Sequence, residues 1–179
     1  IDVKQNPLYE NEDLAYLDTH YYGGIKKYQW VTLPLALHGV IVKTDGTVQK
    51  VNIGEKEDDP VFFVSDLLVH LSADQLDKKA SAAIVGEQLN VIAGSIPFDD
   101  EDVSKKVKFN ILKLLNEQYG LTEEDFLSAE IEIVPAGKSR DVGFDRGLIV
   151  GYGHDDKVCA FPALKAILDT NEPKRTCAC

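Results

Sequence analysis

The feature that most constrains the fold is the apolar run from Leu148 to Val150, which is flanked by glycines. Such a short, uninterrupted run suits a strand covered on both faces of an α/β sheet better than it suits an amphipathic edge strand. A glycine-rich turn with two adjacent carboxylates, Asp155 and Asp156, follows, and a helix pattern then continues to Asp169. Ligands of α/β sheets gather at the carboxyl ends of strands, so these aspartates are candidate binding residues.

The same two aspartates also fit a structural role. The first turn of a helix offers free N–H groups and the positive end of the helix dipole. Aspartate before an apolar run is an ordinary signal for the residue that caps a helix. From the residues alone, capping is therefore the favoured interpretation of Asp155 or Asp156, and a ligand role is the alternative.

The middle of the chain is rich in predicted strands. Period-two apolar residues predict strands over 33–42 and 48–53, joined by a hairpin at Asp45-Gly46. Further strands are predicted over 89–96 and 131–133. The clearest helix follows residues 99–102 and ends before Gly120. The apolar stripe of this helix comprises Val103, Val107, Ile111, Leu114 and Leu115.

Shorter elements are expected between and after these. One helical turn is expected within residues 11–18, and another short helix begins at Thr122. A third, capped by Ser65 or Asp66, places Leu67, His70 and Leu71 on one face. The chain ends in an expected strand, Cys177 to Cys179. The cysteines are interpreted as buried and reduced, with a metal role as the alternative.

Several stretches resemble the aminopeptidase I and aspartyl aminopeptidase family of dizinc metallopeptidases. One is GYGHDDKVCA at 151–160, preceded by IVPAGKSRDVGFDR at 133–146. The others are NPLYE at 6–10 and THYYGGIKKYQW at 19–30, in the same order as in the family. The resemblance covers only a middle segment of the family's chain. Since the sequence also contains no Met, we expect a fragment, or the ordered part, of a longer polypeptide.

The resemblance implies a fold and a domain organisation. The expected fold is an α/β zinc-peptidase fragment with an inserted α+β, strand-rich dimerisation domain. Residues 1–20 are then an edge segment of the catalytic domain, and residues 21–147 are the inserted dimerisation or regulatory domain. Residues 148–179 return to the catalytic α/β domain as strand, metal-ligand turn, helix and strand.

The resemblance also places the family's bridging metal ligand on Asp155. A co-catalytic dizinc site needs a carboxylate that bridges two cations about 3.5 to 4 Å apart, with further ligands and a general base. Asp156 then becomes an orienting or helix-capping neighbour, and His154 a loop residue beside the site. The family's other ligands match no residue here, so the isolated chain is expected to be inactive and to bind zinc weakly. Cobalt and manganese are alternatives to the two expected zinc ions.

His70 has two interpretations. A lone histidine on the apolar face of a short helix is usually a packing residue. The resemblance instead implies that the segment 68–71 delivers His70 into the active site of a neighbouring subunit, where it binds substrate and stabilises an oxyanion. The family then also implies a homo-oligomer, with dimers building a dodecamer. His20 and His38 are interpreted as structural histidines.

Composition removes some classes of partner. The formal net charge of −11 argues against a nucleic-acid partner, because phosphate binding needs a basic face. No apolar run reaches the roughly 18 residues that a membrane helix requires. We expect a cytoplasmic protein without a membrane partner.

Three functions fit these observations. The first is a metallo-aminopeptidase that releases N-terminal amino acids from peptides by zinc-activated water, with this chain an incomplete part of it. The alternative is a non-catalytic oligomerisation or regulatory module. A third is an α/β protein that binds an anion at the turn from Gly151 to Gly153, which the negative charges of Asp155 and Asp156 disfavour.

Overall fold

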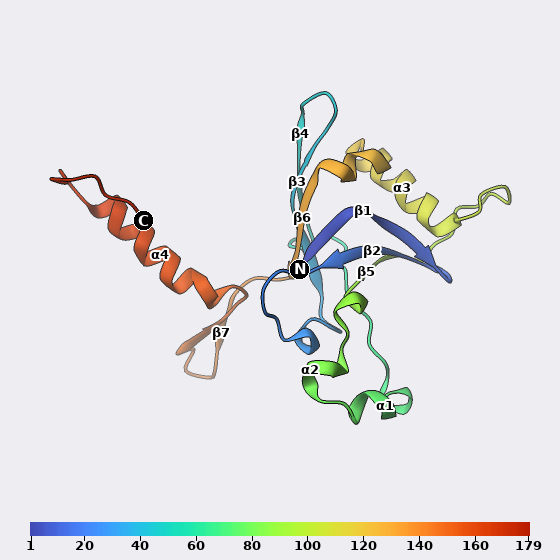
Figure 1. The fold of residues 1–179 in the computed structure, drawn as a ribbon, viewed down its shortest axis with the longest axis horizontal. Coiled ribbons are helices and arrows are strands. Elements are labelled where there is room, and N and C mark those ends of the chain that lie inside the picture. The colour runs from blue at the N-terminus through green and yellow to red at the C-terminus, as the bar shows by residue number, and fades with distance from the viewer. The chain divides into compact units, whose positions relative to one another are not determined.

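The computed structural model describes residues 1–179, and the chain divides into two compact units. The N-terminal unit is Ile1–Gly137 and the C-terminal unit is Lys138–Cys179. Figure 1 shows the first as a curved sheet with helix α3 and several short helices, and the second as a hairpin followed by helix α4.

A six-stranded sheet forms the centre of the N-terminal unit, in the order β4-β3-β6-β1-β2-β5. Every pair of neighbours in this sheet is antiparallel. The strands are β1 (Asp2–Asn11), β2 (Leu14–His20), β3 (Leu35–Val42), β4 (Val48–Ile53), β5 (Val91–Gly94) and β6 (Ala129–Pro135). The hairpin predicted at Asp45-Gly46 is confirmed, since β3 pairs with β4 from Leu37 opposite Ile53 to Val42 opposite Val48.

Residues 61–64 join the two sides of this sheet. Phe62 exchanges backbone hydrogen bonds with Leu35 of β3, at N–O distances of 2.7 and 2.9 Å. The next residue, Phe63, accepts a bond of 3.0 Å from the amide of Ile92 in β5. The segment therefore connects β3 to β5, and the sheet curls into a barrel-like ring with β4 attached outside it.

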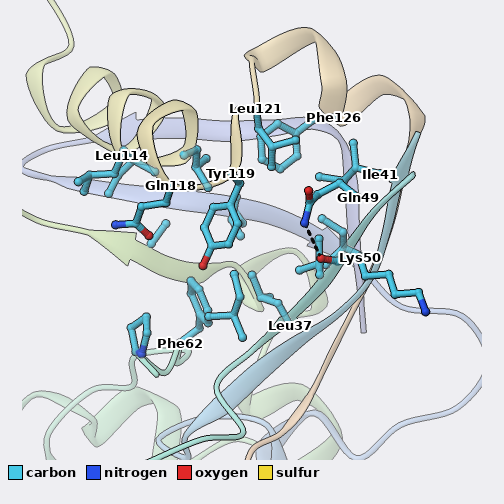
Figure 2. Close-up of a pocket in the computed structure, with 18 of the residues that line it drawn as sticks. Leu37, Ile41, Gln49, Lys50, Phe62, Leu114, Gln118, Tyr119, Leu121 and Phe126 are labelled. Carbon is cyan, nitrogen blue, oxygen red and sulfur yellow. Dashed lines mark hydrogen bonds between the residues drawn. The ribbon is translucent and has the colours of Figure 1, made fainter. Parts of the chain in front are cut away.

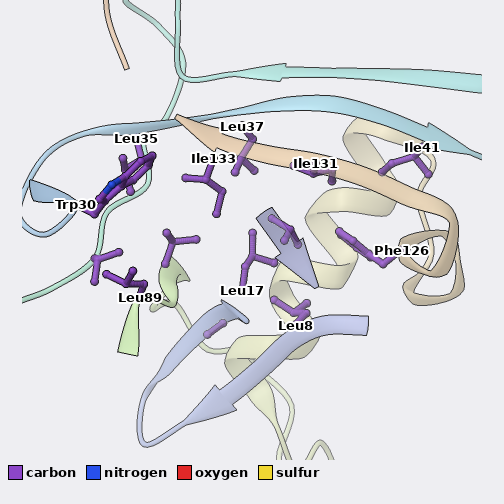
Figure 3. Close-up of a cluster of buried hydrophobic side chains, with 14 of the residues drawn as sticks. Leu8, Leu17, Trp30, Leu35, Leu37, Ile41, Leu89, Phe126, Ile131 and Ile133 are labelled. Carbon is purple, nitrogen blue, oxygen red and sulfur yellow. The ribbon is translucent and has the colours of Figure 1, made fainter. Parts of the chain in front are cut away.

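The hydrophobic core fills the inside of this curl (Figure 3). Strand β2 shows why, because Ala15, Leu17 and Thr19 are buried while their neighbours are partly exposed. This period of two is that of a strand with one buried face. The helical turn predicted within residues 11–18 is therefore wrong. The largest fully buried side chains are Leu35, Ile41, Leu89, Ile133, Val64, Val91 and Pro7.

Helix α3 (Lys106–Tyr119) is the predicted helix, and it ends as expected at Gly120, whose φ is +61°. Two charged side chains, one from β1 and one from the residue after β3, cap its ends. Glu10 of β1 accepts a bond of 2.7 Å from the backbone N–H of Lys108 in the first turn. Lys43 donates to the carbonyls of Tyr119 and Gly120 at 3.2 and 3.0 Å. The residues before Lys106 are not helical, so the helix begins later than predicted.

The remaining elements of this unit are short. The predicted helix after Thr122 is the 3-10 helix η4, whose first turn carries a capping box between Thr122 and Asp125. The predicted short helix near Ser65 is instead a 3-10 turn, η2, followed by one turn of α-helix, α1. The bounds are η1 (Lys27–Gln29), η2 (Val69–Leu71), α1 (Ala73–Leu76), α2 (Ala80–Ala83), η3 (Gly86–Gln88) and η4 (Glu123–Ser128).

The C-terminal unit contains strands β7 (Arg140–Val142) and β8 (Leu148–Val150) and helix α4 (His154–Asp169). Strand β8 pairs only with β7, antiparallel, and its three side chains are exposed. The expected burial on both faces is therefore not found within this chain. The strand expected at Cys177 to Cys179 does not form, and the cysteines are free and exposed rather than buried.

The strand-rich α+β character is confirmed, whereas the insertion of one domain into another remains a prediction. The boundary predicted after residue 20 falls inside the sheet, because β1 and β2 pair with β6 and β5. The second predicted boundary lies ten residues beyond the break after Gly137. None of the helices has the length and apolarity needed to cross a membrane.

Candidate functional site

The candidate site is the turn between β8 and α4 in the C-terminal unit. Two glycines shape it. A Cβ at Gly151 would lie 2.3 Å from the Ser139 hydroxyl oxygen, so the Ser139 side chain would have to shift to admit one. Gly153 has φ of +81°, in the left-handed region that glycine adopts without a steric cost. Its carbonyl accepts a bond of 3.2 Å from Lys157, which closes the turn into the helix.

Asp156 caps the helix. Its Oδ1 accepts a bond of 3.3 Å from the backbone N–H of Cys159, three residues later. This is the geometry of an N-cap side chain. The backbone angles of both aspartates are non-helical, and regular helix follows them. The capping role predicted for Asp156 is therefore confirmed.

Asp155 is exposed and makes no side-chain hydrogen bond or ion pair within the chain. It precedes the capping residue, at a peptide bond that is cis. Because Asp156 already provides the cap, the carboxylate of Asp155 is free to bind an external group. A carboxylate is a hard oxygen donor that suits divalent cations.

The thiol of Cys159 is the titratable group most affected by this turn. A hydrogen bond to the Asp156 carboxylate is the main cause that raises the pKa of Cys159, with a smaller contribution from desolvation. A neighbouring negative charge disfavours the thiolate, which is the form that binds metals. Cys159 is therefore poorly suited to be a ligand beside Asp155.

The donors needed to hold a metal do not meet within this chain. No three His, Cys, Asp or Glu side chains are grouped as ligands. A dizinc centre needs several ligands per ion, so the residues present do not fit a complete centre. Asp155 is the candidate for one ligand, and His154, although exposed, is not gathered with it into a ligand group.

His70 lies in the other unit, in the 3-10 turn η2. It is exposed, and so are its apolar neighbours Leu68, Val69 and Leu71, at 57%, 68% and 68%. The interpretation of His70 as a packed histidine is therefore wrong for this chain. The side chain has no hydrogen bond or ion pair here, so both ring nitrogens are available to another molecule.

The other two histidines have acidic neighbours. His38 Nε2 lies 2.9 Å from Glu55 Oε1 in a partly buried pair between β3 and the segment after β4. His20 Nε2 lies 3.8 Å from Asp2 Oδ2 at the surface. These contacts agree with the structural roles predicted for both residues.

Two cavities in the N-terminal unit have no counterpart in the sequence patterns. One is apolar and lies between α3 and the sheet (Figure 2). The other is more polar and lies beside Ser65, Asp66 and Leu67, close in sequence to His70. Gln75 donates to Asp66 Oδ1 at 2.8 Å on its wall. Their linings come from distant segments, so no local motif could have indicated them.

Comparison with known proteins matches nearly the whole chain to one protein family. A family model described as "Aminopeptidase I zinc metalloprotease (M18)" matches residues 1–178. A "Probable M18 family aminopeptidase 1" from Clostridium acetobutylicum is 63% identical over 177 residues, which are 99% of this chain and 38% of that protein. Its namesake from Thermotoga maritima is 54% identical over 174 residues, which are 97% and 38% of the two chains.

Solved structures agree with these matches. An M18 family aminopeptidase from Thermotoga maritima superposes with a TM-score of 0.89 at 53% identity, covering 97% of this chain and 38% of that one. Aminopeptidase I from Clostridium acetobutylicum gives 0.88 at 58% identity, covering 98% and 39%. The chain therefore spans a little over a third of the length of the relatives it matches.

Proposed function

The chain belongs to the aminopeptidase I zinc metalloprotease family (M18), and we propose that it forms part of an enzyme that releases N-terminal amino acids from peptides with zinc-activated water. The observation that carries the proposal is the family match over residues 1–178. These residues include the turn in which the Asp155 carboxylate has no hydrogen-bond or ion-pair partner. The exposed β8 strand and α4 helix beside that carboxylate are consistent with a larger catalytic domain around them.

Within that enzyme, we assign Asp155 as the carboxylate that bridges two zinc ions. Its neighbour Asp156 holds the start of α4 in place. The other ligands come from parts of the protein outside these residues, because the chain groups no three donors. The isolated chain is accordingly expected to lack peptidase activity. Cobalt or manganese in place of zinc would use the same oxygen donor.

The assignment predicts different results for two isosteric variants of the full-length enzyme. Asp155→Asn removes the bridging charge, so peptidase activity should fall below detection and bound metal should decrease. Asp156→Asn keeps a capping oxygen and should retain both metal and most activity. Metal content by mass spectrometry and initial rates on a peptide substrate measure the two effects. Normal metal content and rate in Asp155→Asn would contradict the assignment.

We further propose that His70 acts in the active site of a neighbouring subunit, within a homo-oligomer built from dimers and extending to a dodecamer. Its exposure and its lack of a partner in this chain support that role. A donor aimed at a developing oxyanion is typically worth about 10²- to 10³-fold in kcat. His70→Ala in the full-length enzyme should therefore lose activity on that scale.

Mixed oligomers test the role in trans. Subunits with only His70→Ala are mixed with subunits with only Asp155→Asn under conditions that allow exchange. Each parent is nearly inactive, but some sites of a mixed dimer combine an intact Asp155 with an intact His70 from the other chain. Activity should reappear on mixing. If verified mixed dimers recover no activity, His70 does not act across the interface.

A non-catalytic oligomerisation module is the second candidate for this chain expressed alone. One observation favours it: the N-terminal unit has a closed core of its own, while its segment 67–71 exposes apolar side chains. Sedimentation of the isolated chain tests this candidate. A monomer at all concentrations would exclude it.

A further inference from the structure

The N-terminal unit contains an apolar cavity of about 280 Å³ that the peptidase proposal does not use. It lies at one end of the curled sheet, between α3 and the strands. Leu17, Leu37 and Ile131 from the sheet line it on one side, and Ile111 and Leu115 from α3 line it on the other. Figure 2 shows lining residues from α3 and from the strands on opposite sides of the pocket.

The pocket is a recess partly open to solvent, with exposed residues such as Val61 and Leu114 in its lining. Its walls are mostly apolar, so water inside it finds few hydrogen-bond partners. A molecule with an apolar group would replace that water and gain contacts with the lining residues.

The rim limits the chemistry of such a molecule. Gln49, Gln118 and Tyr119 border the cavity. Gln49 donates to the carbonyl of Lys50 at 3.0 Å, whereas the hydroxyl of Tyr119 has no partner in the chain and points from α3 into the space beside Phe62 (Figure 2). The ammonium group of Lys50 is directed away from the cavity in the same view. The lining therefore offers the Tyr119 hydroxyl and the side-chain amide of Gln118 as free polar groups, and no charge that would balance a charged ligand.

We propose that this cavity is a binding site for a small neutral molecule with an aliphatic chain or an aromatic ring and one polar end. The apolar part occupies the space between Leu37 and Ile111, and the polar end bonds to the Tyr119 hydroxyl. Mouths of barrel-like sheets are a common position for small-molecule sites. The proposal is independent of the peptidase site, because all the lining residues belong to the N-terminal unit.

Methyl NMR of the full-length protein tests the site with hexan-1-ol as the neutral probe and hexanoate as its charged counterpart. The four isoleucines Ile41, Ile53, Ile111 and Ile131 line the cavity, while Ile96 and Ile149 are exposed elsewhere. Hexan-1-ol should shift the four cavity methyl signals saturably and leave the other two unchanged. Hexanoate should bind at least about tenfold more weakly, since its charge has no partner.

Two rim substitutions locate the binding. Leu114 and Gln118 are exposed residues on α3 that border the cavity, so Leu114→Trp and Gln118→Trp should obstruct it without disturbing the core. Each should weaken hexan-1-ol binding by about tenfold or more. Leu127→Trp is the control, because Leu127 is exposed at 58% and does not line the cavity.

Three results would overturn the proposal. The first is the absence of saturable shifts at the four cavity isoleucines in folded protein. The second is binding that both tryptophan variants leave unchanged. The third is a crystal structure of the full-length protein in which a side chain from another segment or from a second copy already fills the cavity.

Discussion

The two units of this chain differ most in how they bury apolar residues. The N-terminal unit contains a continuous core in which Leu35, Leu89 and Ile133 are fully buried. The C-terminal unit has no buried residue, and apolar side chains on α4, including Phe161 and Leu168 at 67% and 69%, are exposed to solvent. Both contain strands and a helix, so the difference lies in packing rather than in secondary structure.

Because of this difference, the unit that has its own core is not the unit that carries the proposed metal ligand. An isolated two-stranded hairpin is at best marginally stable, and so is an isolated helix shorter than about 12 to 15 residues. The C-terminal unit consists of one pair of three-residue strands and one 16-residue helix, whose regular part begins only after Asp156. Yet this unit carries Asp155, the proposed metal ligand. The proposed catalytic turn therefore lies in a unit without a core of its own, whereas the N-terminal unit has one.

The largest predicted effect comes from one pair of leucine truncations in the 179-residue chain. Leu35→Ala removes a fully buried side chain and should reduce the free energy of unfolding by about 2 to 5 kcal/mol. Leu164→Ala removes a side chain that is 52% exposed and should change it by less than about 0.5 kcal/mol. Urea unfolding followed by the fluorescence of Trp30, which lies in the core, measures the effect of each change on the N-terminal unit.

Hydrogen exchange provides the independent measurement. Amides of β3 and β6 should be strongly protected, and those of α4 should exchange at rates close to those of an unfolded peptide. Strong protection of α4 in the isolated chain, or a large destabilisation by Leu164→Ala, would show that the C-terminal unit packs against something within the chain. The contrast between the units would then be wrong.

A smaller effect is expected at the ends of α3, which are capped by side chains from β1 and from the residue after β3. Glu10→Ala removes the acceptor for the Lys108 amide and should reduce the free energy of unfolding by about 1 kcal/mol. Lys43→Met keeps the apolar stem but removes the donor to Tyr119 and Gly120, at a cost of about 0.3 to 1 kcal/mol.

Matched controls distinguish capping from a general effect of charge. Glu101→Ala and Lys79→Met alter exposed residues whose side chains make no bond in the chain, and both should leave stability within about 0.5 kcal/mol of the wild type. If Glu10→Ala is no more destabilising than Glu101→Ala, the sheet does not stabilise the start of α3.

The sequence predicted the parts of the fold that local patterns determine. The Asp45-Gly46 hairpin, the end of α3 at Gly120 and the short helix that starts at Thr122 all form, because each depends on residues within a few positions of one another. The family resemblance is likewise confirmed over nearly the whole chain. These signals need no knowledge of distant contacts.

Long-range packing explains what the sequence did not predict. Residues 11–18 were expected to contain a helical turn, but the pairing of Leu17 with Leu8 and Val91 makes that segment a strand. The start of α3 depends on Glu10, which lies 98 positions from Lys108. Conversely, the run from Leu148 to Val150 has the pattern of a buried strand, but its side chains are exposed within its own unit.

In the candidate site, too, the local features were predicted and the features that depend on distant residues were not. The turn between the glycines and the cap at Asp156 follow from local residue types, and both are found. The exposure of His70 could not be predicted, because it depends on where the whole segment 61–71 lies against the sheet. The bridging role of Asp155 and the trans role of His70 stay predictions until the full-length enzyme is tested.

The smallest predicted effect concerns a single local contact in the C-terminal unit. The Asp156 carboxylate raises the pKa of Cys159 through a hydrogen bond, so it lowers the thiolate fraction near pH 8. Asp156→Asn removes that charge while keeping a capping oxygen, and the pKa of Cys159 should fall toward its ordinary value. Alkylation of Cys159 by iodoacetamide at pH 8 should then become faster, and its pH–rate profile should move to lower pH.

Peptide mass spectrometry follows each cysteine separately, with exposed Cys177 as the internal reference in the same sample. This result sharpens the contrast between the units, because the contact spans only three residues and requires no core. If Asp156→Asn leaves the rate at Cys159 unchanged relative to Cys177, even the first turn of α4 is unformed in the isolated chain, and the order of the proposed catalytic turn depends entirely on the rest of the protein.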